Sequence, residues 1–374
     1  MIICGDALTE LQRLQDESVH CCVTSPPYWG LRDYGTAKWE GGNNQNCEHQ
    51  VGRATRGGLT EFQKNNIGSF GDEAIRQGGT CPHCGAVRID AQLGLEPTPE
   101  EYVGKLVEIF REVKRILRKD GTLWLNLGDT YHGGGGGNYG TGLSVASEHG
   151  QHLTNVRNRI DLPGLKPKDL VGIPWRVAFA LQADGWYLRS DIIWAKPNPM
   201  PESVTDRPTK SHEYIFLLSK SARYYFDQEA VKEPILDSSI ERLRHSWHGN
   251  KKRDWPGSAQ NNIDRYCGTK SEEELSKIKS SGRNIRSVWT ITTKPMPKVF
   301  GAEHFATFPP EIPERCIKAG CPKGGVIIDP FFGAGTTGLV AMRLGRDFIG
   351  IELNPKYCEM AKKRIYGELE EATA

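Results

Sequence analysis

The chain of 374 residues contains no apolar run that approaches the roughly 20 residues with which a helix crosses a bilayer. It also lacks the pattern of a secretory signal peptide. These two absences predict a cytoplasmic protein without a membrane partner. Because cytoplasmic thiols stay reduced, the ten cysteines are expected to be core residues or metal ligands rather than disulfide partners.

A strong charge imbalance is missing as well. The 48 Lys and Arg residues nearly balance the 46 Asp and Glu residues, which leaves a net charge of +2. Any attraction to nucleic acid must therefore come from local patches rather than from the overall charge. With 37% hydrophobic and 25% charged residues, the composition is that of an ordinary globular protein.

Short apolar runs rich in Val, Ile and Leu recur along the chain and are typical of buried parallel strands. They are residues 2–4, 19–24, 122–127, 187–194, 214–218, 326–328 and 348–351. Apolar residues at helical spacing lie between them, most clearly at Val103, Leu106, Phe110, Val113 and Leu117. Strands that alternate with helices predict an α/β fold with one seven-stranded, doubly wound, Rossmann-like sheet.

Three stretches interrupt this alternation: 35–98, 131–165 and 235–295. The second contains five consecutive glycines, which favour either a plain surface loop or a lid that a ligand orders. The third is basic, with eleven Lys or Arg against six Asp or Glu between Glu241 and Arg286, and it carries several Trp and Tyr residues. Such a composition suits contact with phosphates and bases, although a solvated helical insertion is the alternative.

The segment Val326–Thr337 is expected to form a strand, an acidic turn, a pair of glycines and the start of a helix. Glycines let the backbone approach a ligand closely, and a helix N-terminus offers unpaired N–H groups. The next strand ends in Glu352, where a carboxylate is placed to hold ribose hydroxyls. The spacing GxGxxG is absent, but the combination predicts a cofactor that contains a nucleoside.

Two motifs resemble those of one family, the DNA amino-methyltransferases. The Asp329-Pro-Phe-Phe lead resembles their S-adenosylmethionine motif, and Thr24-Ser-Pro-Pro-Tyr-Trp-Gly30 resembles their catalytic motif, (S/N/D)PP(Y/F/W). The catalytic motif comes first in this chain, as in the β group of the family. That order implies a circularly permuted sheet, in which residues 1–4 supply the strand that follows the helix 355–369.

The resemblance covers most of the chain, since 121–129, 190–198, 211–218 and 308–309 look like the intervening motifs of the family. It implies five segments. These are a catalytic part of the core (1–34), an insertion (35–98), the continued core (99–234), a target-recognition region (235–295) and a cofactor-binding part (296–374).

The resemblance also assigns roles to individual residues. The implied catalytic residues are Ser25, Pro26, Pro27 and Tyr28. The implied cofactor-binding residues are Asp6, Phe308, Asp329, Phe331, Gly333, Gly335, Thr336, Thr337 and Glu352. The candidates for DNA contact in the basic stretch are Arg242, Arg244, Lys251, Lys252 and Arg253.

The proposed chemistry concerns an exocyclic amine, which is a poor nucleophile because its lone pair is delocalised into the ring. If Ser25 Oγ and the Pro26 carbonyl accept the two amino hydrogens, the lone pair turns toward the methyl donor. The prolines fix that carbonyl, and Tyr28 is expected to stack on a base flipped out of the duplex. Lys196 and Asn198 either frame this site or are structural.

Serine at the first motif position favours N4-cytosine methylation in double-stranded DNA, whereas N6-adenine enzymes more often carry Asp there. No Pro-Cys dipeptide occurs, so the cysteine nucleophile of C5 methylation is missing. N6-adenine methylation is the main alternative. A non-catalytic DNA-binding regulator, an RNA methyltransferase and a protein glutamine methyltransferase are further alternatives, and a partner restriction endonuclease is an open expectation.

A cysteine group in the first insertion has the spacing of a zinc knuckle. Cys47 and His49 form one close pair, and Cys81 and Cys84 form the other, with His83 as an alternative to His49. Four ligands would make a closed, structural Zn²⁺ site. The alternative is a pair of unrelated polar turns.

Overall fold

The computed structural model describes residues 1–30, 36, 38–44, 46–47, 81, 83–90, 92–132, 164–244, 271–293 and 308–373. These residues divide into two compact units. The larger comprises Met1–Phe226 with Ser287–Ala374, and the smaller comprises Asp227–Arg286.

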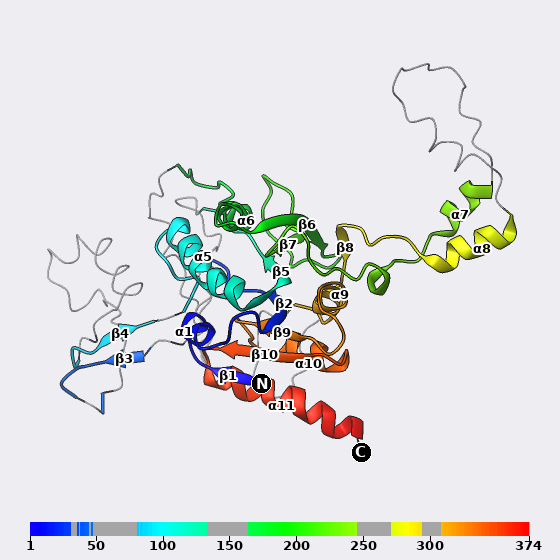
Figure 1. The fold of residues 1–374 in the computed structure, drawn as a ribbon. Coiled ribbons are helices and arrows are strands. Elements are labelled where there is room, and N and C mark those ends of the chain that lie inside the picture. Colours follow the sequence, from blue (N-terminus) through cyan, green and yellow to red (C-terminus); the bar gives the residue numbers. More distant parts are fainter. Residues whose placement is uncertain are drawn as a thin grey trace. The chain divides into compact units, whose positions relative to one another are not determined.

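The larger unit is built on one eight-stranded sheet (Figure 1). In spatial order its strands are β1 (Ile2–Cys4), β10 (Asp347–Glu352), β9 (Val326–Asp329), β2 (Val19–Thr24), β5 (Leu117–Leu127), β7 (His212–Ser219), β6 (Tyr187–Ala195) and β8 (Val288–Thr290). The first and last strands of the sequence are neighbours, because β1 pairs in parallel with β10 and Ile2 lies opposite Gly350.

The sheet differs in two ways from the seven parallel strands that the sequence predicts. It has an eighth strand, β8, which pairs with β6 and is too short to give a clear apolar run. In addition, β7 is antiparallel to both β5 and β6. Residues 196–211 between β6 and β7 contain no helix, so the chain returns directly, and a buried antiparallel strand carries the same apolar run as a parallel one.

Helices cover both faces of this sheet (Figure 1). The helices α1 (Ala7–Gln12), α5 (Pro99–Ile116) and α6 (Ile173–Ala183) share a core cluster with Cys22 of β2. The helices α9 (Glu311–Gly320), α10 (Thr336–Arg343) and α11 (Pro355–Thr373) form the other layer. Gly320 of α9 packs there so closely that a Cβ atom would lie 3.2 Å from Cys21 Sγ. Neighbouring residues of β2 therefore face opposite layers, as the alternation of a strand requires.

Four parallel strands end at one edge of the sheet, where polar residues gather. The ladder places Cys22 beside Ile328, Asp329 beside Gly350, and Glu352 beside Cys4. The residues that follow β2, β9, β10 and β1 therefore meet at the carboxyl edge, where open α/β sheets bind their ligands.

Part of the insertion 35–98 forms a small separate sheet. Its strands β3 (Lys38–Glu40) and β4 (Val87–Ile89) pair antiparallel, with Trp39 opposite Arg88. The glycine run at 133–137 lies outside the described residues.

The smaller unit contains a short 3-10 helix, η1 (Glu229–Val231), and two helices, α7 (Asp237–Arg244) and α8 (Glu272–Ser281). Ser271 begins α8 with a capping box, in which its hydroxyl and the Glu274 side chain exchange bonds with the backbone. Lys279 joins the two helices by donating to Asp237 at 2.7 Å. This unit overlaps the predicted target-recognition region 235–295, whereas β8 within that region belongs to the large sheet.

None of the helices in the described part of the chain is both long enough and apolar enough to span a membrane.

Candidate active site

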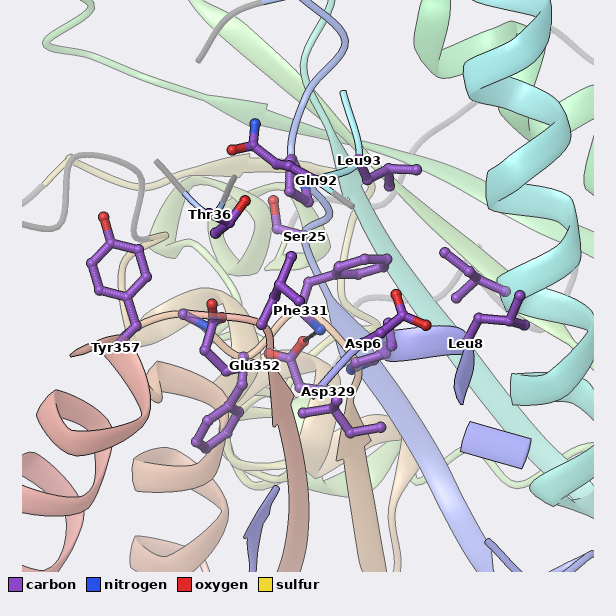
Figure 2. Close-up of a pocket in the computed structure, with 18 of the residues that line it drawn as sticks. Asp6, Leu8, Ser25, Thr36, Gln92, Leu93, Asp329, Phe331, Glu352 and Tyr357 are labelled. Atoms are coloured by element: carbon purple, nitrogen blue, oxygen red, sulfur yellow. Dashed lines mark hydrogen bonds between the residues drawn. The ribbon is translucent and has the colours of Figure 1, made fainter. Parts of the chain in front are cut away.

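A cavity of about 310 Å³ opens at the carboxyl edge of the sheet, which is within the usual size range of ligand sites. Figure 2 shows side chains from β9, β10, the loop after β2 and the start of α1 converging on it. The predicted site residues that line it are Asp6, Ser25, Pro27, Phe308, Asp329, Phe331, Gly333, Thr336, Thr337 and Glu352. Gly335, Pro26 and Tyr28 are not among its lining residues.

Asp329 fixes the turn after β9 through hydrogen bonds within the protein. Its Oδ1 accepts from Thr24 Oγ1 at 2.6 Å and from the Phe331 backbone N–H at 3.1 Å, and its Oδ2 accepts from Thr337 Oγ1 at 2.7 Å. Burial raises the pKa of Asp329 to about 6, although the hydrogen bonds from these donors act to lower the pKa. The residue thus ties β2, β9 and α10 together beside the cavity.

Glu352 shapes the neighbouring wall. Its Oε2 accepts from the Gly333 N–H at 2.7 Å and its Oε1 accepts from the Asn354 N–H at 2.8 Å, while burial raises its pKa. Each carboxylate oxygen can accept more than one bond, so the side chain retains capacity for ligand hydroxyls. Gly335 adopts φ +78° as the residue before α10, a left-handed conformation that favours glycine.

The turn also needs glycine at a strand position. At Gly350 of β10 an added Cβ would lie 2.4 Å from the ring of Phe332, and at Gly338 it would lie 2.5 Å from the same ring. The aromatic ring of the Asp-Pro-Phe-Phe lead therefore packs directly on the backbone of β10 and α10, which holds the turn at the edge of the sheet.

The catalytic motif follows β2 as a rigid loop. Tyr102 of α5 donates to the Pro27 carbonyl at 2.9 Å, and Trp29 Nε1 donates to the Glu96 carbonyl at 2.9 Å. Pro26 is a buried residue, and among the described residues no group donates a hydrogen bond to its carbonyl. The Pro27 carbonyl is thus engaged by α5, whereas that of Pro26 remains an available acceptor.

Tyr28 takes part in a polar network that the sequence did not predict. Its hydroxyl donates to Glu213 Oε2 at 2.6 Å, accepts from Asn126 Nδ2 at 2.8 Å, and lies 3.3 Å from Ser25 Oγ. Burial raises the pKa of Tyr28 well above its ordinary value, and the Glu213 carboxylate adds to this shift. The ring packs on Gly128, where an added Cβ would lie 2.5 Å from Tyr28 Cε2.

Several further residues of the site were given no role in the sequence analysis. Gln92, Leu93 and Glu96 line the cavity although they belong to the insertion 35–98. Asn126 of β5 and Glu213 of β7 lie in the motif-like stretches 121–129 and 211–218, but the resemblance assigned no role to either residue. A buried polar residue inside a strand usually has a hydrogen-bond partner, and the partners of Asn126 include Ser25 and Tyr28 of the loop after β2.

The remaining candidates near the loop have defined partners. Lys196 forms an ion pair with Glu213, and its Nζ lies 4.3 Å from the centre of the Trp194 ring. Asn198 exchanges two hydrogen bonds with the backbone of Thr293, at 3.1 Å and 3.0 Å. Asn198 therefore connects two segments of the backbone.

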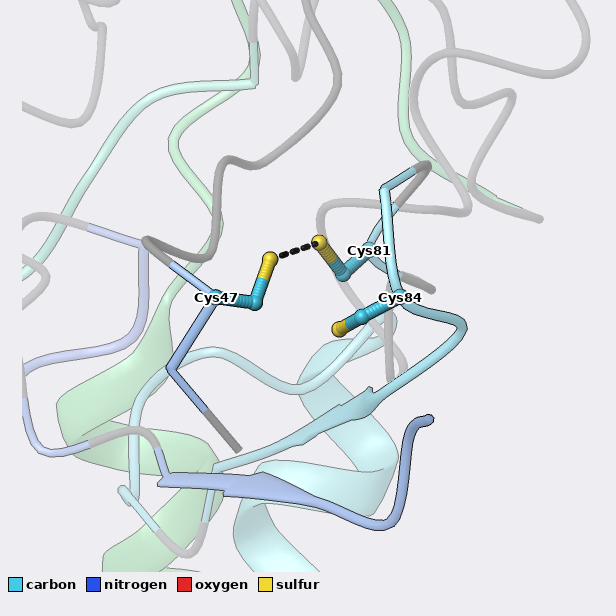
Figure 3. Close-up of side chains that lie close together, drawn as sticks. All are labelled: Cys47, Cys81 and Cys84. Atoms are coloured by element: carbon cyan, nitrogen blue, oxygen red, sulfur yellow. Dashed lines mark hydrogen bonds between the residues drawn. The ribbon is translucent and has the colours of Figure 1, made fainter. Parts of the chain in front are cut away.

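Three thiols of the predicted zinc knuckle come together (Figure 3). The Sγ atoms of Cys47, Cys81 and Cys84 lie within 4.8 Å of one another. The turn after Cys81 is closed by a bond from the Gly85 N–H to the Cys81 carbonyl at 2.8 Å, and Gly85 has φ +73°. His49 lies outside the described residues, and His83 is exposed and not part of this cluster.

The candidates for DNA contact fall only partly in the described chain. Arg242 is exposed on α7, where its guanidinium donates to Ser239 Oγ at 3.3 Å. Arg244 ends α7, its side chain is not described, and Lys251, Lys252 and Arg253 lie outside the described residues.

Comparison with known proteins identifies relatives of this chain. A family model described as DNA methylase, of the N6 and N4 type, matches residues 19–363 of this chain. The Type II methyltransferase M.Cfr9I of Citrobacter freundii is 41% identical over 97% of this chain and 87% of its own length. M.SmaI of Serratia marcescens is 40% identical over 97% of this chain and 90% of its own length. These matches confirm the family that the two motifs indicated.

A solved structure shares the fold. The PvuII DNA methyltransferase, described as cytosine-N4-specific, superimposes with a TM-score of 0.53 and 16% identity, covering 97% of this chain and 85% of that one. The predicted α/β methyltransferase fold is thus confirmed, with the eight-stranded mixed sheet described above.

Proposed function

The chain belongs to the DNA methylase family of N6 and N4 amino-methyltransferases, and from this premise we propose that it methylates the N4 amine of cytosine within a specific site of duplex DNA. The relatives named above are Type II methyltransferases. We therefore propose that the protein acts beside a cognate restriction endonuclease, in the cytoplasm of a bacterium or of a phage-infected cell. The observation that carries it is Ser25, which follows β2 and lines the same cavity as Asp329 and Glu352.

S-adenosylmethionine fits this cavity by the chemistry of its walls. When bound, it supplies a methyl group on a sulfonium, which is a good leaving group. Glu352 offers carboxylate oxygens for ribose hydroxyls, and Gly333 lets the backbone come close. Asp6, the N-cap residue of α1, and Phe331 extend the same lining, and we assign the nucleoside to this wall. Asp329 fixes the turn after β9 through its hydrogen bonds to Thr24, Phe331 and Thr337.

The amine is proposed to lie against the catalytic loop. Ser25 Oγ and the Pro26 carbonyl accept its two hydrogens, which makes the nitrogen more tetrahedral and turns its lone pair toward the donor. Holding the reacting atoms in this arrangement accounts for most of the expected acceleration. Support comes from the Pro26 carbonyl, to which no described residue donates, while Tyr102 engages that of Pro27.

The choice of cytosine rests on serine at position 25. Purified protein, duplex DNA and labelled S-adenosylmethionine should give N4-methylcytosine after digestion to nucleosides and mass analysis. The variant Ser25→Ala should lose transfer by about 100-fold or more while it still binds the cofactor. Detection of N6-methyladenine alone would assign the enzyme to the adenine class. Methylation of RNA in place of DNA, or no transfer at all, would reject a DNA methyltransferase.

We also propose that the thiol cluster binds one structural Zn²⁺. Cys47, Cys81 and Cys84 provide three sulfur ligands at one point, and tetrahedral zinc accepts such a set with one more nitrogen or sulfur ligand. Sequence position favours His49 as the fourth. Elemental analysis should give about one zinc per chain, lost in Cys84→Ser and in His49→Ala but kept in His83→Ala. Full zinc content in His49→Ala with loss in His83→Ala would exchange the two histidines, and metal-free wild-type protein would reject the site.

The smaller unit, 227–286, is proposed to contact the target DNA through its exposed cations, including Arg242. Exchange of Arg242 for Ala should weaken DNA binding and lower its salt dependence by about one counterion. An unchanged salt dependence would remove this residue from the interface.

A further inference from the structure

A hydrogen-bonded chain leads from Ser25 to an acid that lies away from the cavity. Ser25 Oγ lies 3.3 Å from Tyr28 Oη, and Tyr28 Oη lies 2.6 Å from Glu213 Oε2. Ser25 lines the cavity and Glu213 does not. The carboxylate sits near the start of β7, with its side chain 15% exposed and its other oxygen paired with Lys196.

The chemistry of the groups fixes the direction of this chain. An ionised carboxylate only accepts hydrogen bonds, so Tyr28 must donate to Glu213. The Tyr28 oxygen then accepts from Ser25 and from Asn126 Nδ2, which lies 2.8 Å away. Because burial keeps the pKa of Tyr28 high, its hydroxyl remains a donor at ordinary pH.

Among the described residues, this direction leaves Ser25 with at least one free lone pair. A hydroxyl has one donor hydrogen and two acceptor positions. The hydrogen of Ser25 is used on Tyr28. Asn126 Nδ2 has two hydrogens and three acceptors within reach, Tyr28 Oη at 2.8 Å, Glu213 Oε2 at 3.0 Å and Ser25 Oγ at 3.3 Å, so it occupies at most one acceptor position of Ser25. The remaining position is the acceptor that an amino hydrogen of the base requires. Glu213 therefore sets the polarity of Ser25 although it does not touch the base.

On the basis of the proposed function, we propose that Glu213 is the terminal acceptor of the proton that the target amine loses, with Ser25 and Tyr28 as the relay. As the nitrogen lone pair forms the bond to the methyl carbon, one N–H bond of the amine breaks and its proton passes to Ser25 Oγ. The original Ser25 hydrogen moves to Tyr28 Oη, and the Tyr28 hydrogen moves to Glu213 Oε2. The methylated amine is left neutral, the bonding pair of the transferred methyl stays on sulfur, and Glu213 is left protonated.

The matched control is another carboxylate of the same unit. Glu112 of α5 is 23% exposed and paired with Arg115, as Glu213 is paired with Lys196, but it has no bond to the catalytic loop. Both residues can be changed to Gln, which keeps the shape of the side chain and removes the charge.

The experiment measures single-turnover methyl transfer to duplex DNA, together with the Kd values for S-adenosylmethionine and DNA and the thermal midpoint. Glu213→Gln should slow transfer by about 100-fold, a typical contribution of acid–base catalysis, with both Kd values and the midpoint unchanged. Glu112→Gln should transfer at the wild-type rate. A residue with only a structural role would change binding or the midpoint instead.

A double-mutant cycle tests the relay itself. Tyr28→Phe breaks the chain and retains the ion pair of Glu213, so Tyr28→Phe combined with Glu213→Gln should be no more than about twofold slower than Tyr28→Phe alone. Losses that multiply, or a wild-type rate in either single variant, would overturn the relay. Should Glu213→Gln not fold, the rate of Tyr28→Phe decides by itself. Wild-type protein that methylates no DNA would refute the proposed function instead, so the two failures are distinguishable.

Discussion

The two sides of the proposed active site, the cofactor side around Asp329 and Glu352 and the amine side around Ser25, are held together in different ways. On the cofactor side, the fixing bonds join residues of the C-terminal part of the chain, such as Thr337 to Asp329 and Gly333 to Glu352, and Thr24 adds one longer connection. On the amine side, the catalytic loop after β2 is fixed by side chains from three other elements, Tyr102 of α5, Asn126 of β5 and Glu213 of β7. The cofactor side therefore depends mainly on a local motif, and the amine side depends on the packing of the whole sheet.

Both sides have in common a glycine that an aromatic ring covers. Tyr28 packs on Gly128 on the amine side, and Phe332 packs on Gly350 on the cofactor side, so one type of substitution can perturb either side alone. Gly104 of α5 is a matched control, because an added Cβ there meets nothing within 4 Å.

The largest effect is expected for Gly128→Ala. The new methyl group would lie 2.5 Å from the Tyr28 ring, so the ring and its hydroxyl must move away from Asn126 and Glu213. We expect the rate of methyl transfer to fall about 100-fold, as displacements of about 1 Å can do, with the Kd for S-adenosylmethionine unchanged. Stopped-flow transfer assays and calorimetric titration measure the two quantities. Weaker cofactor binding at an unchanged rate would contradict the separation of the two sides.

A smaller effect, on cofactor binding rather than on the rate of transfer, is expected for Gly350→Ala. Its methyl group would lie 2.4 Å from the Phe332 ring and would push on the turn that carries Gly333. Overpacking should reduce the free energy of unfolding by about 1–3 kcal/mol and weaken cofactor binding more than it slows transfer at saturating cofactor. Gly104→Ala should leave binding and rate unchanged and slightly raise stability, since alanine favours a helix. Equal losses in Gly104→Ala and Gly350→Ala would show that the contact with Phe332 is not the cause.

The smallest effect concerns pH. Burial raises the pKa of Asp329 to about 6 from the ordinary value of 3.8, so the folded protein holds this proton more tightly than the unfolded chain. Its contribution to stability is therefore greatest below the unfolded pKa and is lost as pH rises through about 6. The free energy of unfolding of the wild type relative to Asp329→Asn should fall by about 2 kcal/mol between pH 4 and pH 7. A difference that is constant with pH, measured by denaturant titration, would show that Asp329 does not titrate in this range.

The sequence by itself predicted the proposed cofactor side and the proposed role of the loop after β2. The strand, turn and glycine pattern around Asp329 and Gly333 involves residues that are neighbours in the sequence, so it can be recognised without the structure. The two prolines of the loop after β2 likewise predict a rigid backbone from the sequence alone. The apolar runs likewise located all strands of the large sheet except β8, and helical spacing located α5, whereas α1 and α9 were not among the expected helices.

Only the tertiary structure decided the direction of β7 and the partners of Tyr28. A buried strand shows the same apolar run in either direction, so nothing in residues 212–219 distinguished a parallel strand from an antiparallel one. That direction pairs Asn126 with Ile215, which places Glu213 of β7 close to Asn126 and within 2.6 Å of a tyrosine 185 residues earlier in the chain. A contact of this range depends on how the sheet is assembled, and for that reason the proposed proton acceptor could be found only in three dimensions.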